Sequence, residues 1–275
     1  MEGQIAGLHI EQGSPLRYAL CFLDQPPIPL NERIGRTLSF SYQDLIRCTY
    51  CNRRTKKSYN NGYCFLCFRQ LARCDQCIVK PEQCHFHLGT CREPDWGQRV
   101  CMQHHIVYLS YTSHIKVGIT RMPNVPRRWY DQGATAALPI YQAPTRRASG
   151  YLEVALKAYF RDKTQWRQML STKGCDVDLR AAIIDAHNDG VIERYIEDEP
   201  LFSERAPIPL YQSADVCRIE YPADTLPPKI TAINLEKTPD YSGRLLGIKG
   251  QYLLFDTGVL NIKKYTGFHI NLSIE

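Results

Sequence analysis

The sequence has no run of about 18 apolar residues, the shortest length that suits a membrane-spanning helix. Its first twelve residues, MEGQIAGLHIEQ, have no basic start followed by an apolar core, so they do not resemble a secretory signal. We therefore expect a cytoplasmic protein without a membrane partner. Disulfides rarely persist in that reducing compartment, so the twelve cysteines need another explanation.

Nine of the twelve cysteines and four of the eight histidines fall in one stretch, residues 48–105. Cys48 and Cys51 form one Cys-x-x-Cys pair, and Cys64 and Cys67 form a second. A two-residue gap lets both sulfurs of a turn reach one ion, and tetrahedral zinc takes four such ligands. The spacing therefore predicts a zinc-ribbon-like segment with a structural Zn²⁺ on these four thiolates.

The remaining cysteines and histidines of this stretch are numerous enough for a second structural Zn²⁺, and the sequence leaves two ligand sets open. The first set is Cys74, Cys77, Cys84 and one of His85, His87 or Cys91. The second set is Cys84, Cys91, Cys101 and either His104 or His105.

The net charge of +6 is unevenly distributed along the chain. Residues 48–170 carry 19 Lys and Arg against seven Asp and Glu, a net charge of +12, whereas residues 171–275 carry −5. A basic block of this kind is typical of a surface that binds phosphate polyanions. We therefore expect DNA or RNA as the partner. The alternatives are a solvated basic face and a scaffold that binds a protein partner through its zinc segment.

The hydrophobic patterning predicts an α+β protein with β-rich ends. The ends share a Gly-flanked pattern, GQIAGL at residues 3–8 and GRLLGI at residues 243–248, so they either pair into one β-domain or match by chance. The expected parts are a β-rich N-terminal segment (1–47), a zinc-binding region (48–105), a small mixed α/β domain (106–200) and a β-rich C-terminal segment (201–275).

The middle of the chain contains two strand patterns followed by three helix patterns. The strands are expected at 106–112 and 115–120. Pro126 suits the start of a short helix, and Ser149 is expected to cap a second helix. A single longer helix is expected at 178–195. Residues 200–241 are expected to be an irregular connector that contains at most one strand, at 215–221.

These motifs, in this order, resemble the GIY-YIG endonuclease domain over residues 105–170. Ile106-Val107-Tyr108 matches its first motif, and Lys116-Val117-Gly118 matches the second, which often reads Lys-Ile-Gly in the phage-type branch. The resemblance implies a mixed α/β fold and a metal-dependent phosphodiesterase. The residues that it implies are Tyr108 to activate the attacking water, Arg127 or Arg128 to neutralise the scissile phosphate, and Glu153 to hold Mg²⁺ or Mn²⁺.

The sequence departs from that family at three points. Lys116 replaces the tyrosine of the second motif, Ile106 replaces the first glycine, and the late asparagine has no clear counterpart. A degenerate GIY-YIG-like domain that only binds nucleic acid is therefore the alternative to a nuclease. The whole chain, with its cysteine pairs and a GIKGQYL segment at 247–253, also resembles an uncharacterised bacterial family known by a domain-of-unknown-function label.

Overall fold

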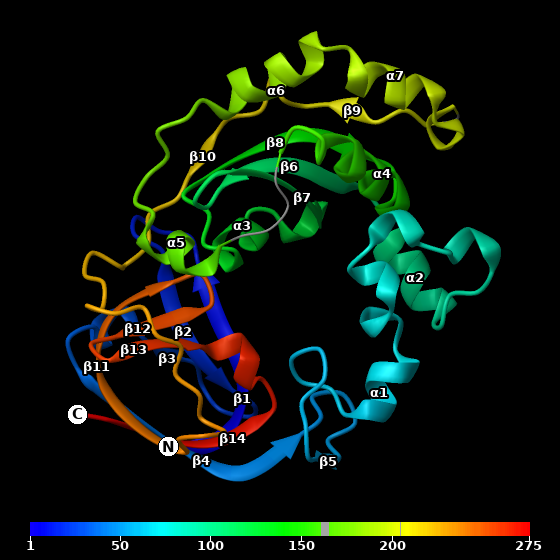
Figure 1. Ribbon diagram of the computed structural model, residues 1–275. Helices are drawn as coiled ribbons and strands as arrows, with labels where there is room; N and C mark the ends of the chain where they lie inside the picture. The colour runs from blue at the N-terminus through cyan, green and yellow to red at the C-terminus, as the bar shows by residue number, and fades with distance from the viewer. Residues whose placement is uncertain (161–164, 204) are drawn as a thin grey trace. The chain divides into compact units, whose positions relative to one another are not determined.

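The computed structural model describes residues 1–160, 165–203 and 205–275. The described residues form two compact units, one made of Met1–Gln70 with Glu220–Glu275 and the other of Leu71–Ile219. Each unit contains an antiparallel sheet, so the protein is mixed α+β, as expected (Figure 1). No helix among the described residues is both long and apolar enough to cross a membrane. Residues 161–163, which contribute to the basic block, lie outside the described part of the chain.

In the first unit, strands from the two ends of the chain share one sheet. Its order is β13-β12-β11-β4-β14-β1-β2-β3, and β5 pairs with β4. The strands are β1 (Glu2–Glu11), β2 (Arg17–Phe22), β3 (Ile28–Pro29), β4 (Thr37–Arg47), β5 (Arg54–Thr55), β11 (Asp240–Lys249), β12 (Tyr252–Phe255), β13 (Gly258–Asn261) and β14 (Phe268–Ile274). The unit also holds helix α1 (Phe65–Gln70) and the 3-10 turns η1 (Asn31–Arg33) and η8 (Ile262–Tyr265).

This strand order is a palindrome if β1 to β4 are matched with β11 to β14. The long first strand of each set changes partner at a register shift. In β1 the shift lies between Ile5 and Gly7, and in β11 it lies between Leu245 and Gly247. Each shift falls inside the Gly-flanked pattern that the two ends share, which therefore marks a structural repeat.

Two reciprocal hydrogen bonds connect the halves of this repeat. The Gly35 N–H donates to the carbonyl oxygen of Leu245 (2.7 Å), and the Gly267 N–H donates to that of Ile5 (2.9 Å). Both glycines have a positive φ, 91° for Gly35 and 92° for Gly267, which disfavours any side chain there. Each of these glycines thus donates a hydrogen bond to the residue at which the register shift of the other half begins.

The second unit has a smaller sheet with the order β10-β8-β6-β7, and β9 pairs with β8. Its strands are β6 (His105–Tyr111), β7 (Ile115–Arg121), β8 (Ala136–Ala143), β9 (Ile208–Pro209) and β10 (Cys217–Arg218). Its helices are α2 (Pro94–Cys101), α3 (Arg127–Asp131), α4 (Arg146–Leu156), α5 (Trp166–Ser171), α6 (Leu179–Asn188) and α7 (Val191–Asp198). The 3-10 turns are η2 (Ala72–Cys74), η3 (Gln76–Ile78), η4 (Pro81–Gln83), η5 (Phe86–Leu88), η6 (Met122–Asn124) and η7 (Pro200–Phe202).

Alternation along β6 divides this unit into two layers around its sheet. Val107 and Leu109 enter the main apolar core, to which α4, α6 and α7 contribute. Tyr108 points to the other face, where its ring lies 5.9 Å from that of Trp129 in α3. Figure 1 shows α6 and α7 on one side of the sheet and α3 on the other. Strand β7 forms one edge of the sheet.

Two expected helix boundaries are wrong. Helix α4 begins at Arg146 and is capped by Thr145, whose hydroxyl accepts the Ala148 N–H, whereas Ser149 lies inside the helix. The Ser149 hydroxyl instead donates to the Arg146 carbonyl oxygen. The single helix expected at 178–195 is divided into α6 and α7, because Gly190 adopts a left-handed conformation (φ 65°) between them.

Candidate functional site

Four cysteines of the first unit form a group that can hold a metal ion. Cys48 directly follows β4, and Cys67 lies in α1. The sulfurs of Cys48, Cys51, Cys64 and Cys67 all lie within 4.8 Å of one another, and those of Cys51 and Cys64 are 3.8 Å apart. This arrangement of four thiols suits tetrahedral coordination.

The electrostatics of this group favour a thiolate at Cys48. Burial opposes ionisation, but hydrogen bonds from the backbones of Cys51, Cys64 and Tyr50 outweigh it and lower the pKa of Cys48 to about 7. Burial and the neighbouring thiols raise the pKa of Cys67. The thiolate is the form that binds metal, so a cation at the centre would relieve the cost of bringing these thiols together.

Exposed aromatic and basic side chains surround this group. Tyr50 is 56% exposed and Phe65 is 51% exposed, although each lies next to a cysteine of this group in the sequence. The neighbouring basic side chains Arg53, Arg54, Lys56 and Lys57 are also exposed. Aromatic rings among cations are a feature of surfaces that stack unpaired bases.

The other predicted metal ligands lie in the second unit and separate into different environments. Cys77, Cys84 and Cys101 are buried and pack against one another. The Cys91 thiol donates to the Glu93 carbonyl oxygen (3.5 Å) instead. The remaining three are Cys74, which is buried in η2, His87, which is exposed, and His104, which hydrogen-bonds Gln142 at 3.1 Å.

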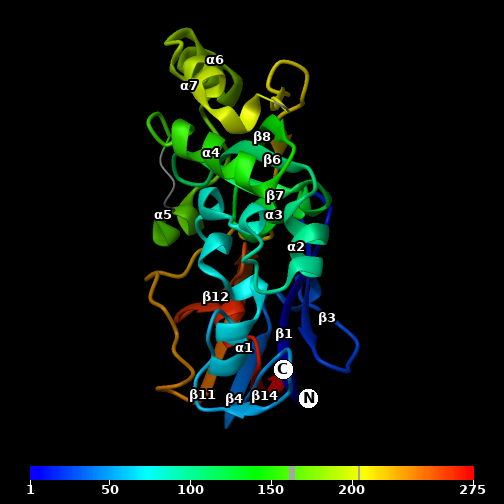
Figure 2. The same cartoon turned by 90° about the vertical axis from the view of Figure 1, so that its right-hand side faces the viewer.

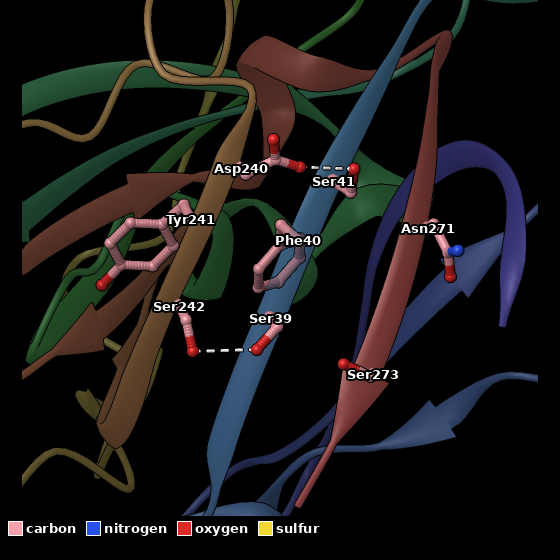
Figure 3. A pocket seen from close by; sticks show the side chains of 8 residues that line it. All are labelled: Ser39, Phe40, Ser41, Asp240, Tyr241, Ser242, Asn271 and Ser273. Atoms are coloured by element: carbon pink, nitrogen blue, oxygen red, sulfur yellow. Dashed lines mark hydrogen bonds between the residues drawn. The ribbon is translucent and has the colours of Figure 1, made fainter.

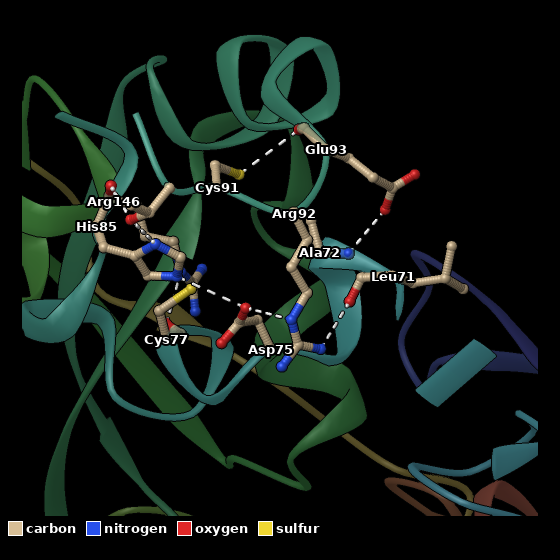
Figure 4. Close-up of polar contacts among 10 residues, drawn as sticks. Leu71, Ala72, Asp75, Cys77, His85, Cys91, Arg92, Glu93 and Arg146 are labelled. Carbon is tan, nitrogen blue, oxygen red and sulfur yellow. Dashed lines mark hydrogen bonds and ion pairs between the residues drawn. The ribbon is translucent and has the colours of Figure 1, made fainter. Parts of the chain in front are cut away.

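The cysteine-rich segment of the second unit, residues 72–101, consists of short helices and turns (Figure 2). Polar contacts hold this segment together (Figure 4). The Asp75 carboxylate accepts from the Arg92 guanidinium (2.7 Å) and lies 3.5 Å from His85 Nε2. Asp75, Cys77 and His85 each place a potential ligand atom within 4.8 Å of the others. The Glu93 carboxylate accepts the Ala72 N–H (2.7 Å).

A polar pocket of about 300 Å³ lies along the edge strand β7 in the same unit. It contains three cationic side chains but a single carboxylate. Its lining residues are Ile78, Val79, Pro81, Lys116, Val117, Gly118, Ile119, Arg128, Gln132, Arg146 and Glu153. Strand β7, helices α3 and α4 and the cysteine-rich segment all contribute, so the fold brings together residues from four parts of the sequence.

Tyr108 lies beneath the pocket and is fully buried. Its hydroxyl donates to the Gln132 side-chain oxygen (2.9 Å) and accepts a hydrogen bond from Arg128. A Cβ at Gly118 would lie 2.8 Å from this hydroxyl oxygen, so only glycine leaves the space that the Tyr108 side chain occupies. Burial raises the pKa of Tyr108 despite the nearby Arg128, so the phenol is protonated at neutral pH.

The structure distinguishes the two neighbouring arginines. Arg128 lines the pocket, whereas Arg127 is not among the lining residues and its Nε lies 3.0 Å from the Asp131 carboxylate. Glu153 also lines the pocket and pairs with Lys157 at 3.5 Å, one helical turn further on. Its side chain is only 14% exposed, so it does not have the solvated environment of an ordinary surface ion pair.

Two pocket residues escaped the sequence analysis although helical spacing could have identified them. Gln132 lies four residues after Arg128, and Arg146 lies seven residues before Glu153, so each shares a helix face with a predicted residue. Arg146 donates to the carbonyl oxygens of Cys77 (3.4 Å) and Ile78 (2.6 Å). It therefore connects α4 to the cysteine-rich wall of the pocket.

A second pocket, of about 310 Å³, lies on the sheet of the first unit (Figure 3). Its hydroxyls bond to one another and to one carboxylate: Ser39 Oγ lies 2.8 Å from Ser242 Oγ, and Ser41 donates to Asp240 (2.6 Å). None of the described residues that line this pocket is cationic. Its chemistry does not suit phosphate, in contrast to the pocket beside β7.

The fold and the cysteines define a mixed α+β protein with two antiparallel sheets and a four-cysteine group that can hold a metal ion. The chain belongs to the family described as "Protein of unknown function (DUF2797)", whose model matches residues 35–270. No curated protein and no solved structure matches the chain. The expected membership of a domain-of-unknown-function family is thus confirmed.

Proposed function

We propose that this protein binds nucleic acid and that the polar pocket beside β7 engages a phosphodiester of DNA or RNA, in a GIY-YIG-like domain that cleaves it. The convergence of Lys116, Arg128 and Glu153 on one pocket, with Tyr108 bonded to the lining residue Gln132, supports this proposal most directly. These four residues come from four elements, β6, β7, α3 and α4, and the sequence singles out each of them.

The charges of the pocket suit a phosphate group. Lys116 and Arg146 are mostly buried, and Arg128 is half-buried beside them. A guanidinium presents paired N–H donors to phosphate oxygens, and partial burial strengthens such contacts relative to contacts in water. A phosphate bound here would offset the repulsion among the three cations, which gives the pocket its preference for an anion.

Glu153 is the residue that would hold Mg²⁺ or Mn²⁺. Magnesium is commonly bound by one or two carboxylates and keeps several waters, so a single carboxylate in a pocket of about 300 Å³ fits that ion. When bound, the ion would supply Lewis-acid stabilisation of the developing charge on phosphate oxygen.

Tyr108 would act as a positioning residue that holds the lining residues Gln132 and Arg128 in place for the reacting groups. Its raised pKa keeps the hydroxyl protonated at neutral pH. Gln132 and Arg128 fix the position of this hydroxyl, so it is preorganised before substrate binds. Lys116, which stands in for the second tyrosine of the resembled motif, would contribute charge to phosphate binding.

The first cysteine group would provide a separate binding surface. A structural Zn²⁺ on Cys48, Cys51, Cys64 and Cys67 would stabilise this zinc-ribbon-like segment, since small sites of this kind fold with their metal. Tyr50 and Phe65 would then stack on unpaired bases while the adjacent Arg and Lys side chains contact phosphates.

Cleavage assays with matched variants test the proposal. Purified protein is incubated with single-stranded, duplex and branched DNA and RNA in the presence of Mg²⁺ or Mn²⁺. Glu153→Gln and Arg128→Gln should each lower the cleavage rate by about 100-fold or more, because each removes charge that stabilises the transition state. Arg127→Gln, which changes the adjacent arginine outside the pocket, should stay close to wild type. Cleavage that is unaffected by Glu153→Gln would contradict the nuclease assignment.

A nucleic-acid-binding module without catalysis is the second candidate. The three cations beside one carboxylate, together with the Glu153–Lys157 ion pair, favour binding of an anion over binding of a metal. This candidate predicts tight binding but no cleavage of any substrate with either ion. A protein-interaction scaffold instead predicts a defined protein partner and no measurable nucleic-acid affinity.

A further inference from the structure

Three buried thiols from separate elements meet in the second unit. Cys77 lies in η3, Cys84 follows η4, and Cys101 is the last residue of α2. Each is at most 9% exposed, and the three pack together in one cluster. Cys84 interacts electrostatically with both of the other thiols and raises the pKa of each. Such a convergence of three sulfurs provides three of the four ligands of a closed tetrahedral site.

His105, at the start of β6, has the properties of a fourth ligand. Its side chain is completely buried, and its Nδ1 lies 2.8 Å from the Gln103 carbonyl oxygen. Its Nε2 is also buried and has no hydrogen-bond partner among the described residues. A buried nitrogen without a partner destabilises the folded protein, because burial removes it from water. Metal-ligating histidines typically donate one ring N–H to a carbonyl and bind the ion through the other nitrogen, as the His105 contacts would allow.

We propose that Cys77, Cys84, Cys101 and His105 form a second tetrahedral metal site that takes Zn²⁺. The site goes beyond the proposed function, because it does not depend on what the polar pocket binds. Cys84 and Arg146 both act electrostatically on His105, so all of these groups are neighbours. The Arg146 guanidinium would offset the net negative charge of three thiolates, one Zn²⁺ and a neutral imidazole.

This set of ligands explains the buried atoms better than the neighbouring group of Asp75, Cys77 and His85. The Asp75 carboxylate already accepts from Arg92 at 2.7 Å. The His85 Nδ1 lies 2.7 Å from the Thr90 hydroxyl, and that group supplies only three ligands. A metal there would leave two buried thiols and the His105 Nε2 without a role.

A metal at this site would stabilise one wall of the polar pocket. Ile78, Val79 and Pro81 line the pocket and lie between the ligands Cys77 and Cys84. A metal joining both ends of this loop to Cys101 and His105 would fix the pocket wall to the start of β6. Loss of the metal should therefore loosen the wall while leaving the first cysteine group intact.

Zinc content of the purified full chain tests the assignment. The wild type should carry about two zinc ions per chain. His105→Ala should carry about one, because the tetrahedral site loses one of its four ligands. His104→Ala is the matched control: it removes an exposed neighbouring histidine and should keep both ions. His105→Cys, which restores a ligand, should also keep both.

A second measurement remains informative if His105→Ala does not fold. In Co²⁺-loaded protein, His105→Cys should shift the visible d–d absorption, because a Cys₃His site becomes a Cys₄ site. His105→Ala with two zinc ions, or an unchanged spectrum in His105→Cys, would overturn the proposal. Loss of one zinc from His85→Ala but not from His105→Ala would assign the site to the Asp75 group instead. Because zinc content is measured without nucleic acid, failure of the nuclease proposal would leave these results unaffected.

Discussion

At the scale of single residues, the contact between Tyr108 and Gly118 is the most restrictive feature of the polar pocket. A Cβ on Gly118 would lie 2.8 Å from the Tyr108 hydroxyl oxygen and 2.9 Å from Cζ. The ring cannot turn away, because it is fully buried beside Trp129 and its hydroxyl is held by Gln132. The glycine of the Lys-Val-Gly motif thus has a steric role that no reading of the motif alone would reveal.

We predict that Gly118→Ala lowers the free energy of unfolding by about 1–3 kcal/mol, since the added methyl overpacks a buried contact. Urea denaturation measures this change. The matched control is the same substitution in a Tyr108→Leu background, where the shorter side chain leaves room for the methyl. Gly118→Ala should then cost less than in the wild type. An equal cost in both backgrounds would show that the clash is not with Tyr108.

At the scale of elements, α4 connects the sheet to the cysteine-rich wall. One face enters the core through Leu152 and Leu156, and the other carries Arg146, Gly150 and Glu153 toward the wall and the pocket. A Cβ on Gly150 would meet the backbone nitrogen of Glu82 and lie 2.6 Å from the carbonyl carbon of Pro81. The absence of a side chain at this position lets the wall approach the helix closely.

We predict that Gly150→Ala destabilises the protein by about 2 kcal/mol, although alanine favours a helix interior over glycine by roughly 1 kcal/mol. The clash outweighs the helix preference, so the net change in stability is unfavourable. The atoms that the added methyl would meet belong to the backbone and cannot rotate away as the end of a side chain can. Val154→Ala, an exposed change in the same helix, should alter stability by no more than about 0.5 kcal/mol. Urea denaturation of both variants gives the comparison, and a Gly150→Ala protein more stable than wild type would contradict the packing described above.

The sequence predicted elements well where periodicity was strong and less well where a tertiary contact decided the outcome. The strands expected at 106–112 and 115–120 match β6 and β7 to within one residue at each end. Strand β8 was not predicted, since Pro139 is unfavourable inside a sheet. The strand tolerates it because a register shift next to Tyr108, opposite Pro139, interrupts the ladder. Likewise, Glu153 was identified from its position in a motif, whereas the bonds of Arg146 to the cysteine-rich wall were not predictable, because its carbonyl partners lie far away in sequence.

At the scale of the whole molecule, the chain combines a duplicated β-unit with an inserted α+β unit, and both carry basic groups. The basic block of residues 48–170 crosses the boundary between the units at Gln70 and Leu71. The first cysteine group and its aromatic rings belong to the first unit, whereas the polar pocket belongs to the second. If both surfaces bind nucleic acid, the two units should contribute by different physical mechanisms, one through stacking and charge and the other mainly through charge.

Salt titration of binding to single-stranded nucleic acid separates these mechanisms. Arg128→Gln should weaken binding. It should also reduce the slope of log K against log salt concentration by roughly 1, because one phosphate contact is lost and one fewer counterion is released. Phe65→Ala should weaken binding by about 1–3 kcal/mol and leave that slope unchanged, because stacking releases no condensed cation. Leu66→Ala is the matched control for Phe65→Ala: it is 49% exposed in the same helix but has no ring, so it should bind as wild type does. Equal losses from Leu66→Ala and Phe65→Ala would indicate general apolar contact, and a slope unaffected by Arg128→Gln would remove the polar pocket from the phosphate-binding surface.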